Sequence, residues 1–507
     1  MLDTLYNGFA GLVGTLNDLM YSYVLIILLL AAGVYFTIRT AGVQVRLLGE
    51  SVRVVSEKSG DTKAVSAFEA LMVSTASRVG TGNIVGVANA IAIGGYGSVF
   101  WMWLIALVGG ATAFVESTLA QIYKKRSAKG GSYGGPSYYI QAALGSRSLG
   151  IIFAIALIAT YAIGFNMLAS FNLIDSMSSY HFYDTLVTAS GAHLLPIIGG
   201  ALLALLVGIC IFGNGNRIVK VTGVLVPVMG VLYIIMALIV MVLNAGMLPE
   251  VLRRIFAGAF DFKAIFGGAA GFGSSALMQG IKRGLYSNEA GVGSAPNAAA
   301  AADVSHPVKQ GLVQMLSVFI DTILVCTATA MMCLCTGIEP SESLKGAPFV
   351  QASLEQTFGA AGPYFITIAL LLFAFTTLLG NLFYCEGCLN YIAGHTLEKG
   401  PMNLFRVIAC LVVFLGAQMK FGLVWDLADV LMGVMALINL PVILILGGTA
   451  MRALNDYLAQ KKAGKDPAFK AASIGLKEKT DFWNYLLPLF LRIFCPQTGV
   501  FRPAGVF

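Results

Sequence analysis

Residues 73–86, VSTASRVGTGNIVG, decide the fold, because they interrupt an apolar run that is long enough to cross a membrane. Two glycines stand two residues apart within this stretch, and a glycine costs about 1 kcal/mol relative to alanine in a helix interior. A second apolar run contains a similar cluster at residues 266–280, FGGAAGFGSSALMQG. Helices that break at mid-membrane expose backbone groups that need partners, and such breaks are typical of transporter sites. We therefore expect helix discontinuities near residues 78–83 and 268–276.

The composition is that of a polytopic membrane protein. Of the 507 residues, 57% are hydrophobic and 11% are charged, whereas soluble domains carry about 25% charged residues. The net charge of +7 is spread between apolar runs, so we expect a lipid bilayer and not a nucleic acid as partner. A spanning helix needs about 20 apolar residues. Eleven runs meet this requirement, at residues 20–39, 66–94, 98–122, 149–176, 194–212, 218–243, 264–286, 309–335, 361–391, 403–418 and 424–448.

The distribution of Lys and Arg predicts the orientation. With the N-terminus outside, most of the 32 basic residues fall on the cytoplasmic side, which satisfies the positive-inside rule. We therefore expect a bacterial inner-membrane protein with its N-terminus outside and its C-terminus in the cytoplasm. The outer loops then hold only Arg253, Arg254, Lys263, Lys345 and Lys420.

The spans divide into two blocks of five that follow one additional helix and run in opposite directions across the membrane. Residues 42–56 mix apolar and charged residues at helical spacing and are expected along the inner interface, as is the apolar stretch 483–494. The expected divisions are an N-terminal part at residues 1–60, a first repeat at 61–246, a second repeat at 247–450 and a cytoplasmic tail at 451–507.

The break in the first repeat has a definite chemistry. The chain there runs from inside to outside, and its outer half-helix begins near Gly82. The free N–H groups and the positive dipole end of that half-helix suit a carboxylate. The inner half-helix ends near residues 76–79, and its free carbonyls suit a small cation or an ammonium group.

Four motifs resemble the alanine/glycine:cation symporter family. The resemblance covers roughly residues 20–450. It implies an all-α, LeuT-type 5+5 inverted repeat with one extra N-terminal helix. It also implies Na⁺-coupled, or in some members H⁺-coupled, uptake of alanine, glycine or a similar amino acid such as serine or glutamine. The motifs are SRVGTGNIVGVANAI at residues 77–91, FWMWLIALVGGATAFVESTLAQIY at 100–123, GLYSNEAGVGSAPNAAAAADVSHPVKQG at 284–311 and VWDLADVLMGVMALINLP at 424–441.

The resemblance also implies a site, because VGTGN is similar to the unwound first core helix of LeuT-type transporters. Main-chain N–H groups would hold the substrate carboxylate, and carbonyl and hydroxyl oxygens would bind Na⁺, a hard cation. The implied substrate-binding residues are Gly80, Thr81, Gly82, Asn83, Phe272, Gly273, Ser274 and Asn381. The implied Na⁺ ligands are Ala76, Val79, Thr376 and Thr377.

The chain departs from the family in its third core span. The family usually carries a Gln shortly after an Asn, whereas Ala169 stands at that position after Asn166. A side-chain contact to the substrate is therefore missing or replaced, so the resemblance does not fix which amino acid is the substrate.

Charged residues inside the spans are a further group of candidates, because a charge at the midplane costs several kcal/mol unless it is paired or hydrated. Either ion pairs between helices or a cytoplasmic gate would account for them. Glu289 and Glu386 lie nearer the inner interface, where solvated or capping roles are expected. The intramembrane candidates are Arg78, Glu116 and Asp321.

Other functions fit less well. A channel needs a continuous polar lining, and a membrane enzyme needs a nucleophile with a base or a metal cluster; the sequence offers neither. A receptor or scaffold would not need two broken helices. The eight cysteines lie mostly in or beside apolar runs and are expected to be free thiols. The oligomeric state is left open.

Overall fold

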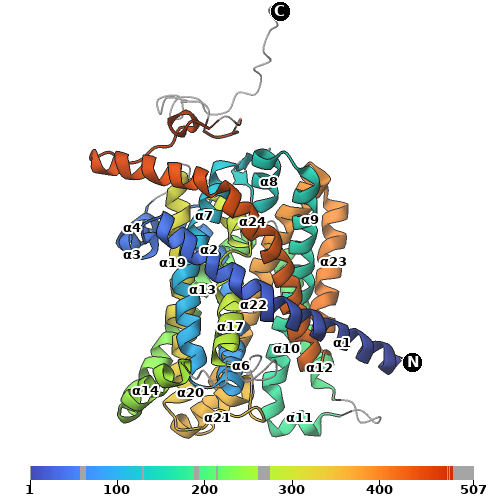
Figure 1. Cartoon of the computed structure of the whole chain (residues 1–507). Coiled ribbons are helices and arrows are strands. Elements are labelled where there is room, and N and C mark those ends of the chain that lie inside the picture. The colour runs from blue at the N-terminus through green and yellow to red at the C-terminus, as the bar shows by residue number, and fades with distance from the viewer. Residues whose placement is uncertain are drawn as a thin grey trace, which may run out of the picture.

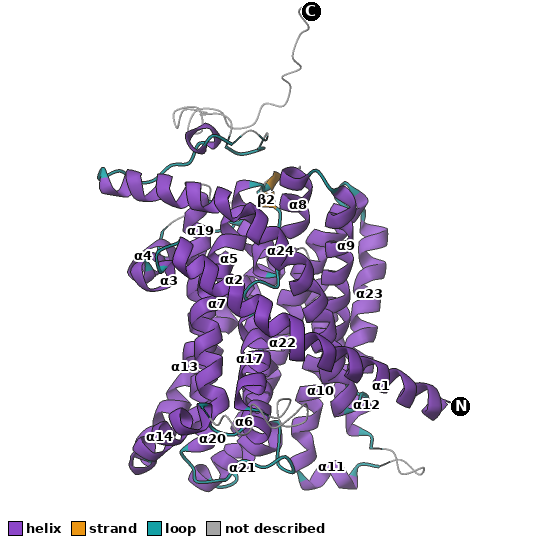
Figure 2. Ribbon diagram, in the orientation of Figure 1, coloured by secondary structure: helices purple, strands orange, loops and turns teal. Residues whose placement is uncertain are grey.

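The computed structural model describes residues 2–57, 64–127, 131–187, 193–212, 215–260, 275–476, 478 and 480–483. In this part of the chain, each of the eleven predicted spans coincides with helix, and eight helices are long and apolar enough to cross a membrane. The shorter apolar helices Gly82–Gly94 and Leu195–Ile211 occupy two more of the predicted spans. The helices form one upright bundle (Figures 1 and 2). The predicted all-helical class is therefore confirmed.

The first helix is longer than the predicted span at residues 20–39. Helix begins near the start of the chain and continues through a π-helical segment to the end of α2, obliquely across the bundle (Figure 1). A hydrogen bond of 2.6 Å from Asn17 to Asp426 ties this extra helix to α24. The elements are α1 (Leu2–Leu19), η1 (Met20–Leu25), α2 (Ile26–Arg39), α3 (Val43–Arg46) and α4 (Leu48–Val55).

The first repeat opens with a capping box. The Ser66 hydroxyl accepts from the Glu69 N–H, and the Glu69 carboxylate accepts from the Ser66 N–H, so α5 begins after Ser66. The elements that follow are α5 (Ala67–Arg78), η2 (Gly82–Gly86), α6 (Val87–Gly94), α7 (Gly97–Ile122), β1 (Lys125–Arg126), β2 (Ser132–Tyr133), α8 (Pro136–Leu144), α9 (Arg147–Ile158), η3 (Ala159–Phe165), α10 (Asn166–Asp175), η4 (Ser176–Ser179), α11 (His181–Thr185), α12 (Leu195–Ile211) and α13 (Gly215–Leu243).

The second repeat has the same helical character. Its elements are η5 (Ala245–Met247), α14 (Leu248–Ala259), α17 (Ala276–Asn288), α18 (Ala295–Ala301), α19 (Pro307–Val318), η6 (Phe319–Cys326), α20 (Thr327–Leu334), α21 (Ala347–Phe358), α22 (Ala361–Ala393), α23 (Lys399–Gly416), α24 (Phe421–Lys462) and η7 (Ala471–Ile474). The helix α24 extends beyond residue 450, where the tail was expected to begin.

The predicted break near residues 78–83 is confirmed. The helix α5 ends at Arg78, and Val79 leaves the helical region with ψ of 83°. Helical structure resumes at η2 as a π-turn and continues as α6.

The other predicted break, near residues 268–276, lies mainly in residues 261–274, outside the described part of the chain. A different break is described just after the predicted span 264–286, between α17 and α18, and was not predicted. Three residues there have positive φ, Glu289 at 53°, Gly291 at 85° and Gly293 at 92°. Left-handed backbone at three positions within five residues stops α17 and turns the chain into α18.

The two broken helices lie side by side and antiparallel. At one end, the N–H of Asp303 just after α18 donates to the carbonyl of Val65 just before α5, at 2.8 Å. At the other end, a Cβ added to Gly94 in α6 would lie 3.2 Å from the Cα of Ala276 in α17. The first helices of the two repeats are therefore inverted relative to one another, as expected.

The bundle has two distinct ends (Figure 1). We call the one that carries α3, α4, α8 and the end of α24 the α8 end, and the one that carries α11, α14 and α21 the α11 end. A cavity of about 810 Å³ lies at the α8 end, between residues of the starts of α5 and α9, α8, α18 and the last turns of α22. The residues that line this cavity do not include those of the break near residues 78–83.

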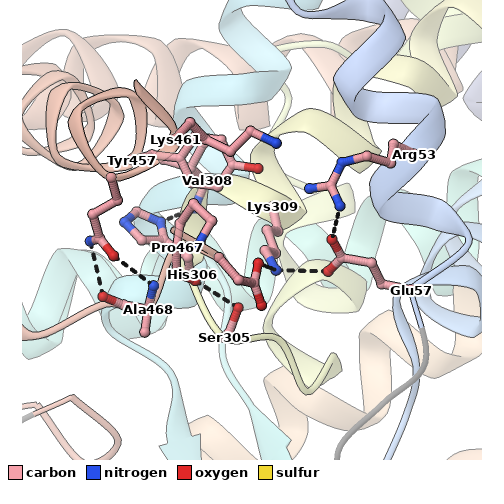
Figure 3. Close-up of polar contacts among 12 residues, drawn as sticks. Arg53, Glu57, Ser305, His306, Val308, Lys309, Tyr457, Lys461, Pro467 and Ala468 are labelled. Carbon is pink, nitrogen blue, oxygen red and sulfur yellow. Dashed lines mark hydrogen bonds and ion pairs between the residues drawn. The ribbon is translucent and has the colours of Figure 1, made fainter. Parts of the chain in front are cut away.

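The C-terminal part of the chain packs on the α8 end (Figure 3). Buried Lys309 at the start of α19 lies 2.7 Å from Glu57 and 3.0 Å from Asp466, and His306 lies 3.2 Å from Asp456 of α24. These contacts join the segment after α24 to α19 and to the chain just after α4. The interfacial stretch predicted at residues 483–494 lies outside the described residues, apart from its first residue.

Seven cysteines are free, as predicted, and the eighth, Cys495, lies outside the described residues.

Candidate functional site

The first helix break is closed by Asn83. In a continuous helix, the Gly80 N–H would donate to the carbonyl of Ala76, and the Asn83 N–H would donate to that of Val79. Instead, the Gly80 N–H donates to Asn83 Oδ1 at 2.9 Å, and the Asn83 N–H donates to the Gly80 carbonyl at 3.1 Å. Two buried carbonyls, of Ala76 and Val79, therefore lose their helical donors, which leaves their oxygens for another partner.

The main-chain N–H groups at the start of the outer half-helix differ in whether they donate a hydrogen bond within the break. The first N–H groups of a helix have no acceptor within that helix. At the start of η2, these groups belong to Thr81 and Gly82. Of the three amides expected to hold a carboxylate, Gly80 is thus engaged by Asn83, and the other two lie at the helix start.

Both glycines of the break are sterically required. A Cβ on Gly80 would lie 2.3 Å from Thr377 Oγ1, and a Cβ on Gly82 would lie 2.1 Å from Cε1 of Tyr286. Real Cβ contacts do not reach such distances, so any side chain at these positions would displace α22 or the Tyr286 ring. The break is therefore a point of close approach between α5, α17 and α22.

The two threonines expected to bind Na⁺ face different surroundings. The Thr377 hydroxyl is buried beside Gly80 and has no hydrogen-bond partner among the residues that the structure describes. The Thr376 hydroxyl donates within its own helix, at 3.0 Å to the carbonyl of Leu372 and at 3.1 Å to that of Phe373. Of the two threonines, Thr377 is therefore the one whose hydroxyl lies unsatisfied at the break among the residues that the structure describes.

Asn381 is part of a buried polar chain and not of an open pocket wall. It accepts from the Ser77 hydroxyl at 2.6 Å and donates to Asn166 Oδ1 at 2.9 Å. One face of α10 continues this chain, because Asn172 donates to the Thr81 hydroxyl at 3.0 Å.

Ala169 lies on the same face of α10, three residues from each of its two asparagines. It is buried at 1% exposure, at the position where the resemblance implied a Gln. Of the two flanking asparagines, Asn172 contacts Thr81 at the first break, and Asn166 contacts Asn381 of α22.

An aromatic group lies against Gly82 and was not predicted. The Tyr286 ring centroid is 4.8 Å from that of Phe165 and 5.3 Å from that of Trp425. Arg283 lies over Trp425 and makes two bonds of 3.0 Å to Asp429. Tyr286 and Trp425 belong to motifs that carry the family resemblance, so their position in those motifs was the available signal. Phe272, Gly273 and Ser274, which were expected to wall the pocket, lie outside the described residues.

The three charged residues predicted inside the spans are buried but not paired with one another. Arg78 is 3% exposed, and Glu116 and Asp321 are 0% exposed. None of them has an ion pair within 4.0 Å in the described part of the chain. Among the described residues, Arg78 bonds only the carbonyl of Gln314, at 3.4 Å, and two of its nitrogens have no partner there. The expected ion pairs between helices are therefore absent for these residues.

Glu116 supports the second break. Its carboxylate accepts from the Gly291 N–H at 3.3 Å and from Asn439 at 2.8 Å, and Asn439 also donates to the Gly291 carbonyl at 3.0 Å. Glu289 is buried at 1% exposure, accepts from the Ser294 hydroxyl at 2.6 Å and is the C-cap residue of α17, so the structure favours the capping alternative over the solvated one. Glu386 pairs with Arg406 at 2.7 Å.

Asp321 connects the two breaks. Its Oδ1 accepts from Asn83 Nδ2 of the first break at 2.7 Å, and its Oδ2 accepts from the hydroxyl of Ser287, which lies two residues before the second break. Asn83, Ser287 and Asp321 come from η2, α17 and η6. The two discontinuous helices therefore share one carboxylate.

Known proteins share this architecture. A crystal structure of MhsT in complex with L-phenylalanine superposes with a TM-score of 0.53 at 13% identity, over 79% of this chain and 93% of that chain. MhsT has the LeuT fold, so the predicted fold class is confirmed.

Sequence comparisons extend over nearly the whole chain. The amino-acid carrier protein AlsT of Bacillus subtilis is 42% identical, over 94% of this chain and 98% of AlsT. The probable sodium/glutamine symporter GlnT of the same organism is 44% identical, over 90% and 92% of the two chains. The sodium/alanine symporter AgcS of Methanococcus maripaludis is 37% identical, over 88% and 98%. The model of the sodium:alanine symporter family matches residues 7–471, which contain both helix breaks and all four motifs. The predicted resemblance is confirmed, and the chain belongs to the sodium:alanine symporter family.

Proposed function

We propose that this chain carries a small neutral amino acid inward together with Na⁺, by alternating access. The observation that carries this proposal is the group of oxygens at the first break. The carbonyls of Ala76 and Val79 have lost their helical donors, and the unsatisfied Thr377 hydroxyl lies beside Gly80. Buried oxygens without partners suit a hard cation such as Na⁺.

The substrate would bind next to this ion. The N–H groups of Thr81 and Gly82 and the positive end of η2 suit the carboxylate. The aromatic group around Tyr286 limits the size of the side chain. Family membership supports alanine and glycine, and the small side chain at Ala169 supports a wider range that includes serine and glutamine.

The orientation that we propose places the α8 end in the cytoplasm and the N-terminus outside, in a bacterial inner membrane. The cavity of about 810 Å³ at the α8 end then faces the cytoplasm, on the side where the substrate is released. We keep the two repeats at residues 61–246 and 247–450, and the charged last turns of α24 lie beyond them, at the α8 end.

Uptake by proteoliposomes tests this function. Purified protein is reconstituted, and labelled alanine, glycine, serine and glutamine are supplied with an inward Na⁺ gradient or with choline in place of Na⁺. The expected result is concentrative uptake of at least one of these amino acids, only with Na⁺, and resistant to a protonophore. Uptake driven equally by an H⁺ gradient without Na⁺ would instead show proton coupling, and equilibration without accumulation would show a passive pore.

A further inference from the structure

The short helix α18 leads from the second break to the cavity at the α8 end. It contains seven residues, begins just after the left-handed residues Gly291 and Gly293, and packs against α5. Its Asn297 and Ala301 line the cavity, to which the first break contributes no residue. Because the first break does not open into this cavity, release of a substrate there requires a movement of the elements between them, and α18 is one of these elements.

The chain that follows α18 is fixed at its first residue. We call residues 302–306, which join α18 to α19, the α18–α19 linker. The side chains of Gln121 and Lys124, at the end of α7 and just after it, both donate to the Ala302 carbonyl, at 2.9 and 2.8 Å. Movement of α18 would carry this linker with it, so these contacts resist the movement.

The C-terminal segment, by which we mean the described residues between 466 and 483, binds the same linker. The Phe469 N–H donates to the Ser305 carbonyl at 2.9 Å. The Ser305 hydroxyl donates to the Pro467 carbonyl at 2.8 Å (Figure 3). The Phe469 ring is 6% exposed and stands edge-on to the ring of His306, with the centroids 5.0 Å apart. The segment therefore contacts the linker through both main chain and side chains.

The end of the C-terminal segment contacts the residues of α7 that hold the linker. The Trp483 indole N–H donates to the Gln121 carbonyl at 2.9 Å. The Lys124 Nζ lies 4.6 Å from the centroid of the Phe482 ring, within the range of a cation–π interaction. Since Gln121 and Lys124 are also the donors to Ala302, the segment supports the linker a second time, through α7.

Further contacts join the two ends of the C-terminal segment and attach it to the bundle. The Ala471 N–H donates to the Trp483 carbonyl at 3.0 Å, and the rings of Phe469 and Trp483 lie edge to face at 5.4 Å. Asp481 forms an ion pair of 3.0 Å with Lys125, just after α7. The segment therefore forms one folded piece that bridges the linker, the end of α7 and α24, from which it extends.

We propose that the C-terminal segment is a clasp that holds α18 in a closed position, and that its release allows the α8 side to open. This proposal rests on alternating access as the mechanism of the proposed function. The clasp contacts one side of the bundle alone, so it stabilises the state that is closed on that side and lowers the fraction of open protein. It thereby sets how readily substrate enters or leaves at the α8 end.

Hydrogen exchange of the full-length protein tests whether the clasp holds α18. In Phe469→Ala/Trp483→Ala, the amides of residues 295–306 should exchange about tenfold faster, which corresponds to about 1.4 kcal/mol. Asp481→Lys, a surface change that folds more readily, places like charges together after α7 and should give about threefold faster exchange. The matched control is Lys470→Ala, because the exposed Lys470 side chain has no hydrogen bond or ion pair among the described residues. The control should exchange like wild type.

Transport measured from each side tests whether the clasp controls opening. Substrate binds from the α8 side only to the open state, so its apparent affinity there rises with the open fraction. In inside-out membrane vesicles with an inward Na⁺ gradient, Phe469→Ala/Trp483→Ala should lower the alanine concentration for half-maximal uptake by about tenfold, while the open fraction is small. In right-side-out vesicles, the same variant should not lower it. Asp481→Lys should show the same asymmetry with a smaller shift.

Unchanged hydrogen exchange at residues 295–306 in both clasp variants would overturn the clasp and leave the proposed function intact. Faster exchange with an unchanged half-maximal concentration on the α8 side would also overturn it, because the segment would then cover the surface without controlling the opening. Absence of Na⁺-driven amino-acid uptake by wild type in either kind of vesicle would reject the proposed function itself, and the clasp with it.

Discussion

Replacing one hydroxyl at a time in the threonine pair on α22 separates ion binding from helix packing. Valine has the shape of threonine and replaces the hydroxyl by a methyl group. In Thr377→Val, the lost hydroxyl has no hydrogen-bond partner in the described structure, so protein stability should change little. In Thr376→Val, the lost hydroxyl is one that donates to two carbonyls of its own helix, so Na⁺ binding should change little.

The expected magnitude follows from the loss of one ligand to a charged ion. A hydrogen bond to a charged group contributes about 1.5–3 kcal/mol, and we take an ion ligand to be similar. Each 1.4 kcal/mol is a factor of ten in affinity. Thr377→Val should therefore raise the Na⁺ concentration for half-maximal alanine uptake by about 10- to 100-fold. Thr376→Val should change it by less than about twofold.

The assay is the initial rate of labelled alanine uptake into proteoliposomes across a series of Na⁺ concentrations, at saturating alanine. Thermal melting of both variants in detergent serves as the control for folding. Equal shifts in the two variants, or a shift in Thr376→Val alone, would refute the assignment of Thr377 as the ligand at the first break.

Three further changes test the first break, the helix α10 and the packing at the α8 end. Gly82→Val should abolish binding of labelled alanine while the protein still inserts, because the new Cβ would lie 2.1 Å from the Tyr286 ring; normal affinity would exclude a substrate at this break. Ala169→Gln should lower uptake of glutamine relative to alanine by filling the space on α10, and an unchanged ratio would place Ala169 outside the pocket. Burial holds the pKa of His306 well below its usual value of about 6.5. The unfolded chain therefore binds more protons below that pH, and stability falls on acidification. His306→Gln should reduce the fall in melting temperature between pH 6.5 and 5, and an undiminished fall would show that another group causes it.

Periodicity and glycine spacing were sufficient to predict the spans and the first break. The apolar runs are long, and VGTGN carries two glycines whose closeness to α17 and α22 explains why no side chain is present there. A break of this kind can be predicted, because closely spaced glycines mark it in the sequence. The C-terminal end of the last helix was harder to predict, because α24 continues as an amphipathic helix whose charged residues resemble those of a tail.

The break between α17 and α18 and the Asp321 contacts could not be predicted in the same way. The backbone at Gly291 is held by Glu116 and Asn439, which are distant in sequence from it and from each other. Similarly, Ser287 and Asp321 lie 34 residues apart in the second repeat and meet because α17 packs beside η6, whereas Asn83 comes to the same carboxylate from the first repeat. Such pairs depend on the tertiary arrangement of helices, and no local pattern of one sequence contains it.

The π-helical segments set a limit on how the length of this chain can vary. Among the described spans, π-turns occur at η1, η2, η3 and η6, and the last three supply Asn83, Phe165 and Asp321 to the site region. A π-turn accommodates one residue more than an α-helical turn. Deleting a single residue from η6 would restore regular α-helical hydrogen bonding while the turns on either side keep their relative orientation, so the residues inside η6 would change direction. Asp321 lies inside η6 and would then leave its position beside Asn83, so a variant with one residue fewer in η6 is expected to lose this contact even where every side chain is identical.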